Sequence, residues 1–123
     1  MDPKKIVTYE DILKIIEQPS KYLIDVRNPN EIEETGKIPS SINIPLGVVG
    51  EVLSTMSNED FTKEYQRPKP TTSDELIFTC QSGRRATSAL ETALKLGYTK
   101  YWWYYPGSAD WVPLPTKPTP NRN

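Results

Sequence analysis

Apolar residues gather along this chain in short runs rich in β-branched and aromatic side chains. Five such runs are typical of strands: 6–8, 22–26, 42–45, 76–79 and 101–105. The run 22–26 is apolar at all but one position, which is typical of a strand covered on both faces. These runs therefore predict a sheet whose central strands are buried.

Segments with helical spacing separate the strands. Isoleucine and leucine recur at helical intervals over 9–17, and Pro19 ends that pattern. The strongest helical pattern covers 84–96, where alanines and leucines share one face and Gly97 follows as the C-cap. Two shorter helices are expected at 48–53 and 60–65. The alternation of strands and helices predicts an α/β fold with a mainly parallel sheet.

Length and tail composition define the domain organisation. The chain has 123 residues, which suits one compact domain and is too short for two ordinary ones. We assign 1–111 to this domain. The segment 112–123 repeats proline without apolar periodicity, so we expect an extended, disordered tail there.

Charge and residue counts exclude several functions. The net charge is -1 and no apolar run approaches the ~20 residues of a membrane span, so we expect neither a nucleic-acid partner nor a membrane partner. The single cysteine forbids an internal disulfide and favours a reducing compartment, the cytoplasm or alternatively the mitochondrion. The absence of histidine removes Cys-His proteases and Ser-His-Asp hydrolases. We therefore expect no metal site of the usual ligand types and no cofactor.

The only cysteine stands in the most informative segment, 78–86. Cys80 follows a predicted strand, and a predicted helix begins at Arg84. Backbone amides and the helix dipole at such a junction favour anions, and nearby arginines lower the pKa of a thiol. Arg85 adds a second positive charge, and Gly83 allows a tight turn. The alternative is a buried cysteine that serves only packing.

A cysteine that is already ionised, in a chain without histidine, suits sulfur transfer better than acyl transfer. The thiolate needs no general base, and sulfite leaving thiosulfate needs no general acid. A Cys-x5-Arg phosphatase loop would require arginine where this chain has Ala86. The sequence therefore disfavours phosphoryl transfer.

Four motifs in order resemble the rhodanese family. They are 22–27 with Glu31, then 36–46, then the loop 80–85, and finally 97–98 with 105–111. The chain is most similar to the small single-domain thiosulfate sulfurtransferases of eukaryotes, including a heat-shock-related subgroup. The resemblance implies a rhodanese-like α/β fold with about five parallel strands and helices on both faces.

The resemblance also implies roles for individual residues. Cys80 would become a persulfide held by the backbone amides of Gln81, Ser82, Gly83, Arg84 and Arg85. Arg85 is the expected ligand of the anionic substrate, while Arg84 is the less favoured ligand because it can simply face solvent. Asp25 and Arg27 would lie near the loop, either supporting it or acting directly. Glu31 and Tyr98 are expected to be structural, and Trp111 to cover the core.

The predicted reaction moves sulfur from thiosulfate to an outside thiol such as glutathione or thioredoxin, with cyanide as an artificial acceptor. An outside acceptor is required because the chain has no second cysteine. Two alternatives remain: a rhodanese-like binding module without turnover, and a regulator that hands a persulfide sulfur to one protein.

Overall fold

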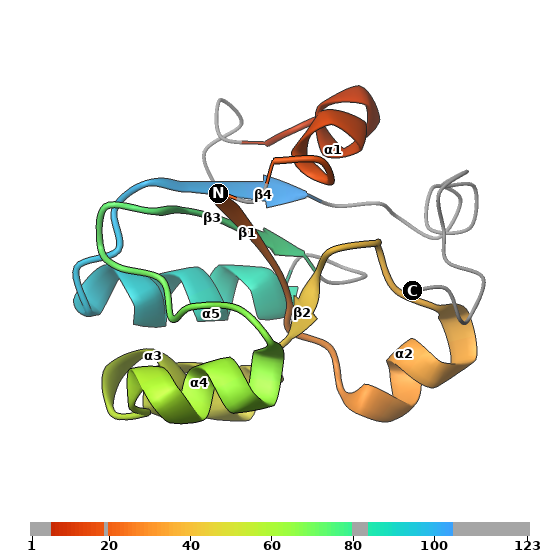
Figure 1. Ribbon diagram of the computed structural model, residues 1–123. Coiled ribbons are helices and arrows are strands. Elements are labelled where there is room, and N and C mark those ends of the chain that lie inside the picture. The colour runs from red at the N-terminus through yellow and green to blue at the C-terminus, as the bar shows by residue number, and fades with distance from the viewer. Residues whose placement is uncertain (1–5, 19, 80–83, 105–123) are drawn as a thin grey trace.

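The computed structural model describes residues 6–18, 20–79 and 84–104 (Figure 1). They form a parallel sheet with helices packed against it. Its strands lie in the order β2-β1-β3-β4. Their bounds are β1 (Lys21–Asp25), β2 (Ile42–Asn43), β3 (Glu75–Thr79) and β4 (Tyr101–Tyr104). Ile6 forms an isolated parallel bridge with Trp103 of β4, at the first of the predicted strand runs. The described residues thus contain four strands and this bridge where five strands were predicted.

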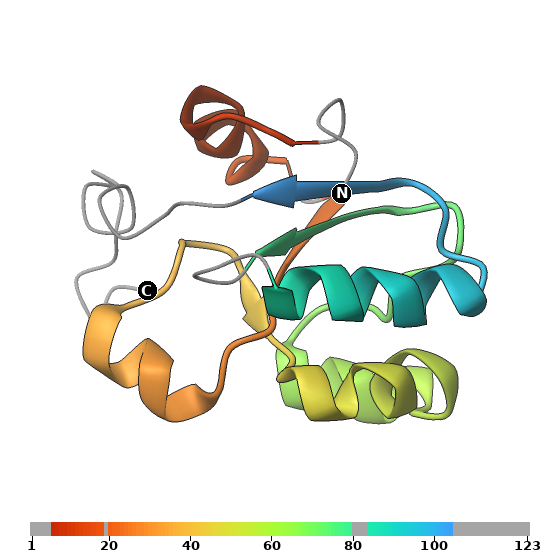
Figure 2. The same ribbon diagram turned by 180° about the vertical axis from the view of Figure 1, so that it is seen from behind.

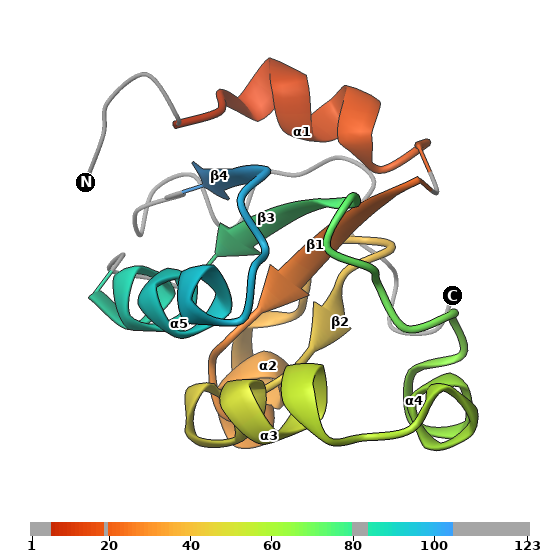
Figure 3. The ribbon, with the colours of Figure 1, turned by 90° about the vertical axis from the view of Figure 1, so that its left-hand side faces the viewer.

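Helices cover both faces of the sheet. Their bounds are α1 (Tyr9–Ile15), α2 (Pro29–Thr35), the short 3-10 helix η2 (Leu46–Val48), α3 (Val49–Ser54), α4 (Asn58–Tyr65) and α5 (Arg84–Lys95). Figure 3 shows α1 above the sheet, and α3, α4 and α5 below it. The predicted α/β fold with a parallel sheet and helices on both faces is therefore confirmed.

The alternation of side chains along each strand divides the core into two layers. Tyr22, Ile24 and Phe78 belong to the apolar cluster that also contains buried residues of α3, α4 and α5. Leu23 and Ile77 belong to the cluster with the buried isoleucines of α1. Because successive strand residues point to opposite faces, the nearly continuous apolar runs of β1 and β3 fill both layers.

Helix α2 was not predicted as a helix. The polar segment 28–30 ends the preceding strand, as expected, but it also begins α2. Asn28 is the N-cap in an extended conformation, and Pro29 stands in the first turn. Proline suits this position because its fixed φ matches the helix and the missing N–H would have no partner there. No side chain of α2 is buried, so the helix has no apolar face for the sequence to reveal.

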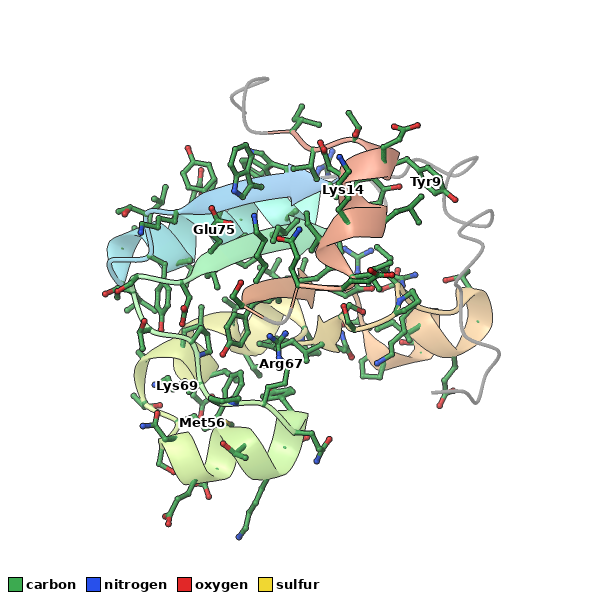
Figure 4. All side chains as sticks on the ribbon, turned by 45° about the horizontal axis from the view of Figure 1, so that its top comes forward. Tyr9, Lys14, Met56, Arg67, Lys69 and Glu75 are labelled. Atoms are coloured by element: carbon green, nitrogen blue, oxygen red, sulfur yellow. The ribbon has the colours of Figure 1, made fainter. Side chains whose placement is uncertain are left out.

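Hydroxyl groups hold the connection between α4 and β3 against the core. The Tyr22 hydroxyl donates a 2.7 Å hydrogen bond to the carbonyl of Pro68, and the Tyr98 hydroxyl donates one of 2.9 Å to the carbonyl of Pro70. Lys69 donates to the carbonyl of Met56, and Figure 4 shows these two labelled residues side by side. Tyr98 is thus structural, as expected. No helix among the described residues is long and apolar enough to cross a membrane.

Candidate functional site

The carboxyl ends of β1 and β3 lie next to each other. Asp25 pairs with Thr79 in the parallel register, and each is the last residue of its strand. The backbone N–H of Val26 donates to the carbonyl of Thr79, which keeps the chains together for one more residue. In parallel sheets this edge is where ligands bind. Thr79 is fully buried, and its hydroxyl has no hydrogen-bond partner among the described residues.

Asp25 and Arg27 form a buried ion pair at this edge. The Arg27 Nη2 atom lies 2.8 Å from Asp25 Oδ2, and Nε lies 3.0 Å from Oδ1. The backbone N–H of Arg27 donates to the same Oδ1 at 3.0 Å. Both side chains are only 1% exposed. A buried charge of either sign needs such a partner, because an unpaired one loses its hydration without compensation.

The same guanidinium reaches the C-terminal end of α2. Arg27 Nη1 donates to Thr35 Oγ1 at 2.7 Å, and Nη2 donates to the carbonyl of Gly36 at 3.0 Å. On the other side, Asn43 Nδ2 donates to the carbonyls of Asp25 and Arg27, at 3.0 and 2.8 Å. The end of β1 is therefore tied to β2 and to α2 by side-chain hydrogen bonds.

The first turn of α5 carries a second ion pair. Arg85 Nη1 and Nη2 donate to Glu31 Oε1 and Oε2 at 2.6 and 2.9 Å, which joins α5 to the first turn of α2. Glu31 Oε1 also accepts from the backbone N–H of Asn28 at 2.8 Å. The hydrogen bonds from Arg85 and Asn28 lower the pKa of Glu31 from 4.5 to about 2. Glu31 is therefore ionised at any physiological pH.

The predicted site residues are only partly described. Cys80, Gln81, Ser82, Gly83 and Trp111 lie outside the described residues, as does the tail 112–123. Of the remainder, Asp25 and Arg27 are brought together at the end of β1, while Arg84 and Arg85 open α5. Arg84 is exposed and makes no ion pair among the described residues. Figures 1 and 2 show α2 and the start of α5 at the end toward which the arrows of β3 and β4 point.

Two supporting residues were missed or undervalued at the level of sequence. Asn43 gave no signal, because an amide near a strand end is common. Glu31 was expected to be structural. The pattern Asn-Pro-x-Glu at 28–31 is typical of a helix start, in which the glutamate bonds back to the N-cap backbone. The network of Asp25, Arg27, Glu31 and Arg85 is charge-balanced, and it frames the point where β3 ends and α5 begins.

Comparison with known proteins identifies the family. The rhodanese-like domain family matches residues 8–113, which is most of the chain. The chain belongs to the rhodanese family. The match includes every helix and strand given above, so the whole described fold is that of a rhodanese-like domain.

Similar rhodaneses carry names of sulfurtransferases. The thiosulfate sulfurtransferase/rhodanese-like domain-containing protein 3 of Mus musculus is 45% identical over 108 residues, which cover 88% of this chain and 68% of the mouse protein. The thiosulfate:glutathione sulfurtransferase of Saccharomyces cerevisiae is 37% identical over 108 residues, 85% of this chain and 76% of that protein.

Solved structures agree with this assignment. The single-domain sulfurtransferase RDL2 of Saccharomyces cerevisiae superposes with a TM-score of 0.73 at 35% identity, over 88% of each chain. Its curated name is "Thiosulfate sulfurtransferase RDL2, mitochondrial". The expected fold and family are thus confirmed, and the family and its named members support sulfurtransferase activity for this rhodanese.

Proposed function

We propose that this rhodanese transfers the outer sulfur of thiosulfate to a thiol through a persulfide on Cys80. In the first step the Cys80 thiolate attacks the outer sulfur, the sulfur–sulfur bond of thiosulfate breaks, and sulfite leaves with the electron pair. In the second step an acceptor thiolate attacks the outer sulfur of the persulfide. The acceptor leaves as a persulfide, and the Cys80 thiolate is regenerated.

One observation carries this proposal: the register of β1 against β3. Thr79 is the partner of Asp25 in the sheet, and Cys80 follows Thr79 in the sequence. The only cysteine of the chain therefore follows directly on the strand end that borders the buried Asp25–Arg27 pair. That edge of a parallel sheet is the usual ligand site, which favours a reactive role for Cys80 over a packing role.

The neighbouring residues take supporting roles in this proposal. The backbone amides of Gln81, Ser82 and Gly83 would hold the persulfide, and positive charge at the start of α5 would attract the anionic donor. Asp25 and Arg27 would support the loop from the neighbouring end of β1. This role fits their burial and their hydrogen bonds to each other. Because Arg27 is buried, its guanidinium does not face solvent, where a substrate would approach.

Glutathione is the proposed acceptor, with thioredoxin or a protein thiol as the broader class. The similar yeast thiosulfate:glutathione sulfurtransferase supports a small thiol. The mitochondrion gains support from the name of the similar RDL2, whereas the cytoplasm stays a prediction from cysteine usage. Partners among nucleic acids or membranes are not part of this proposal.

Intact-mass measurement tests both steps. The protein is incubated with thiosulfate, desalted, and then given glutathione. We expect a gain of the mass of one sulfur atom and its loss on adding glutathione, with Cys80→Ser as the control that gains nothing. No gain with thiosulfate or with other sulfur donors would favour the alternative of a binding module without turnover.

A further inference from the structure

Helix α2 is held by polar contacts at both of its ends. It buries no side chain of its own. At its C-terminal end, Arg27 donates to Thr35 and to the carbonyl of Gly36. At its N-terminal end, the carboxylate of Glu31 accepts hydrogen bonds from both Nη atoms of Arg85. The place of α2 beside the carboxyl edge of the sheet is therefore supported by two arginines, one from the segment after β1 and one from α5.

The contact between Glu31 and Arg85 is bidentate and partly shielded from solvent. The two side chains retain 27% and 29% exposure, and the two nitrogen–oxygen distances are 2.6 and 2.9 Å. A bidentate pair fixes the plane of the guanidinium as well as its position. Glu31 is fixed in turn by the backbone N–H of Asn28, because Oε1 closes the first turn of α2. The first turns of two helices are thus locked to each other.

The same pair reduces the net positive charge that an anion meets at the first turn of α5. Arg85 stands against a carboxylate whose pKa is about 2, so its positive charge is balanced at every working pH. Arg84 is exposed and has no such balance among the described residues. A dianion that approaches the first turn of α5 is attracted to Arg84 and meets repulsion from Glu31 near Arg85.

We propose that Glu31 is a positioning residue of the sulfur-transfer site that acts through Arg85, and that Arg84 is the cation that attracts the anionic donor. This inference rests on the proposed function and assigns separate tasks to the two adjacent arginines. Arg85 joins α5 to α2 and keeps the start of α5 in place. Arg84 contributes to donor affinity.

Steady-state kinetics with thiosulfate separates these tasks. Glu31→Gln keeps an oxygen for the N–H of Asn28 but loses the charge that holds Arg85. We expect kcat to fall between about tenfold and a hundredfold, as for a displaced catalytic element, with a smaller change in KM. Glu34→Gln, an exposed acid on the same helix, is the matched control and should leave both constants unchanged. A loss of kcat in the control as large as in Glu31→Gln would overturn the assignment.

Arg84→Gln should raise KM for thiosulfate with little change in kcat. An unchanged KM would remove the donor role from Arg84. Because the effect is electrostatic, it should shrink as the salt concentration rises. A KM increase that is equally large at high salt would also contradict this role.

Exchange of the two charges distinguishes a positioning pair from a donor-binding arginine. The double variant Glu31→Arg with Arg85→Glu restores an ion pair in which the two charges have exchanged positions. If the pair positions α5, the double variant should recover much of the kcat lost in Arg85→Glu alone. If Arg85 binds the donor, the carboxylate at its position repels thiosulfate, and the double variant stays as poor as the single one. That second result would overturn the inference.

The wild-type mass measurement keeps this test separate from the proposed function. If the wild type gains a sulfur atom but Glu31→Gln gains it at the same rate, only the positioning role fails. If the wild type gains none from any donor, the proposed function fails and this inference falls with it. Circular dichroism and melting temperature of each variant confirm that it is folded before its kinetics are interpreted.

Discussion

Arg27 encloses the carboxylate of Asp25 from three directions, with its backbone N–H, Nε and Nη2 all within 3.0 Å of a carboxylate oxygen. The two residues are separated by a single position, so the turn that leaves β1 is closed by its own side chains. Nη1 and Nη2 of the same guanidinium also donate to Thr35 and Gly36 at the C-terminal end of α2. One arginine thus joins the strand end to the neighbouring helix, and its burial makes the arrangement intolerant of a missing partner.

Removal of one member of this pair should destabilise the fold strongly. Asp25→Asn leaves the buried guanidinium without its countercharge, and breaking a buried pair in this way costs about 3–5 kcal/mol. The partly exposed pair Lys21–Glu75 joins the N-terminal ends of β1 and β3 and provides the control. Glu75→Gln should cost about 1 kcal/mol or less. The midpoints of urea unfolding measure both; equal costs would contradict the buried role of Asp25.

The low pKa of Glu31 gives folding a specific pH dependence. A carboxyl group whose pKa falls on folding contributes stability above its unfolded pKa and loses it as the pH falls toward the folded value. The ordinary pKa is 4.5 and the folded one about 2, so the contribution is complete above 4.5 and fades between 4.5 and 2. We expect the stability difference between wild type and Glu31→Gln to shrink over this window, as measured by urea unfolding at a series of pH values. A constant difference would mean that Arg85 does not lower this pKa.

The parts of the fold with apolar patterns were predictable, and those held by polar contacts were not. The runs at β1 and β3 and the apolar face of α5 indicate their structure locally, since each buries a continuous set of side chains. Helix α2 has no buried side chain and offered only its Asn-Pro start. The family motifs pointed to the site, but the partner of Arg85 lies 54 positions earlier in the chain. No local pattern shows such a pairing. The roles of Cys80 and the loop after it stay predictions.

The buried hydroxyl of Tyr98 provides a test of how the connection before β3 is held. Tyr98→Phe keeps the ring but leaves the carbonyl of Pro70, itself buried, without its donor. We expect a loss of about 1–3 kcal/mol, the cost of a buried unpaired polar group. Tyr65→Phe is the control, because the half-buried Tyr65 hydroxyl makes no hydrogen bond among the described residues. Thermal and urea unfolding compare the two variants, and a loss in Tyr98→Phe no greater than in the control would be inconsistent with this role.

The amide of Asn43 joins β2 to the end of β1, and a nearly isosteric change isolates its hydrogen bonds. Asn43→Asp keeps the shape but replaces the two N–H donors with an oxygen that faces the carbonyls of Asp25 and Arg27. Both carbonyls lose the amide donor and meet a negative charge, although the carbonyl of Asp25 keeps the backbone N–H of Ile44, so we expect a loss of at least about 2 kcal/mol. Asn58→Asp makes the same chemical change at the exposed start of α4, where a helix N-terminus favours a negative charge. That control should be neutral or slightly stabilising in urea unfolding. If both variants lose the same stability, the amide of Asn43 does not hold the strand end, and its support must come from α2 and from the backbone hydrogen bonds of Ile44 and Leu46.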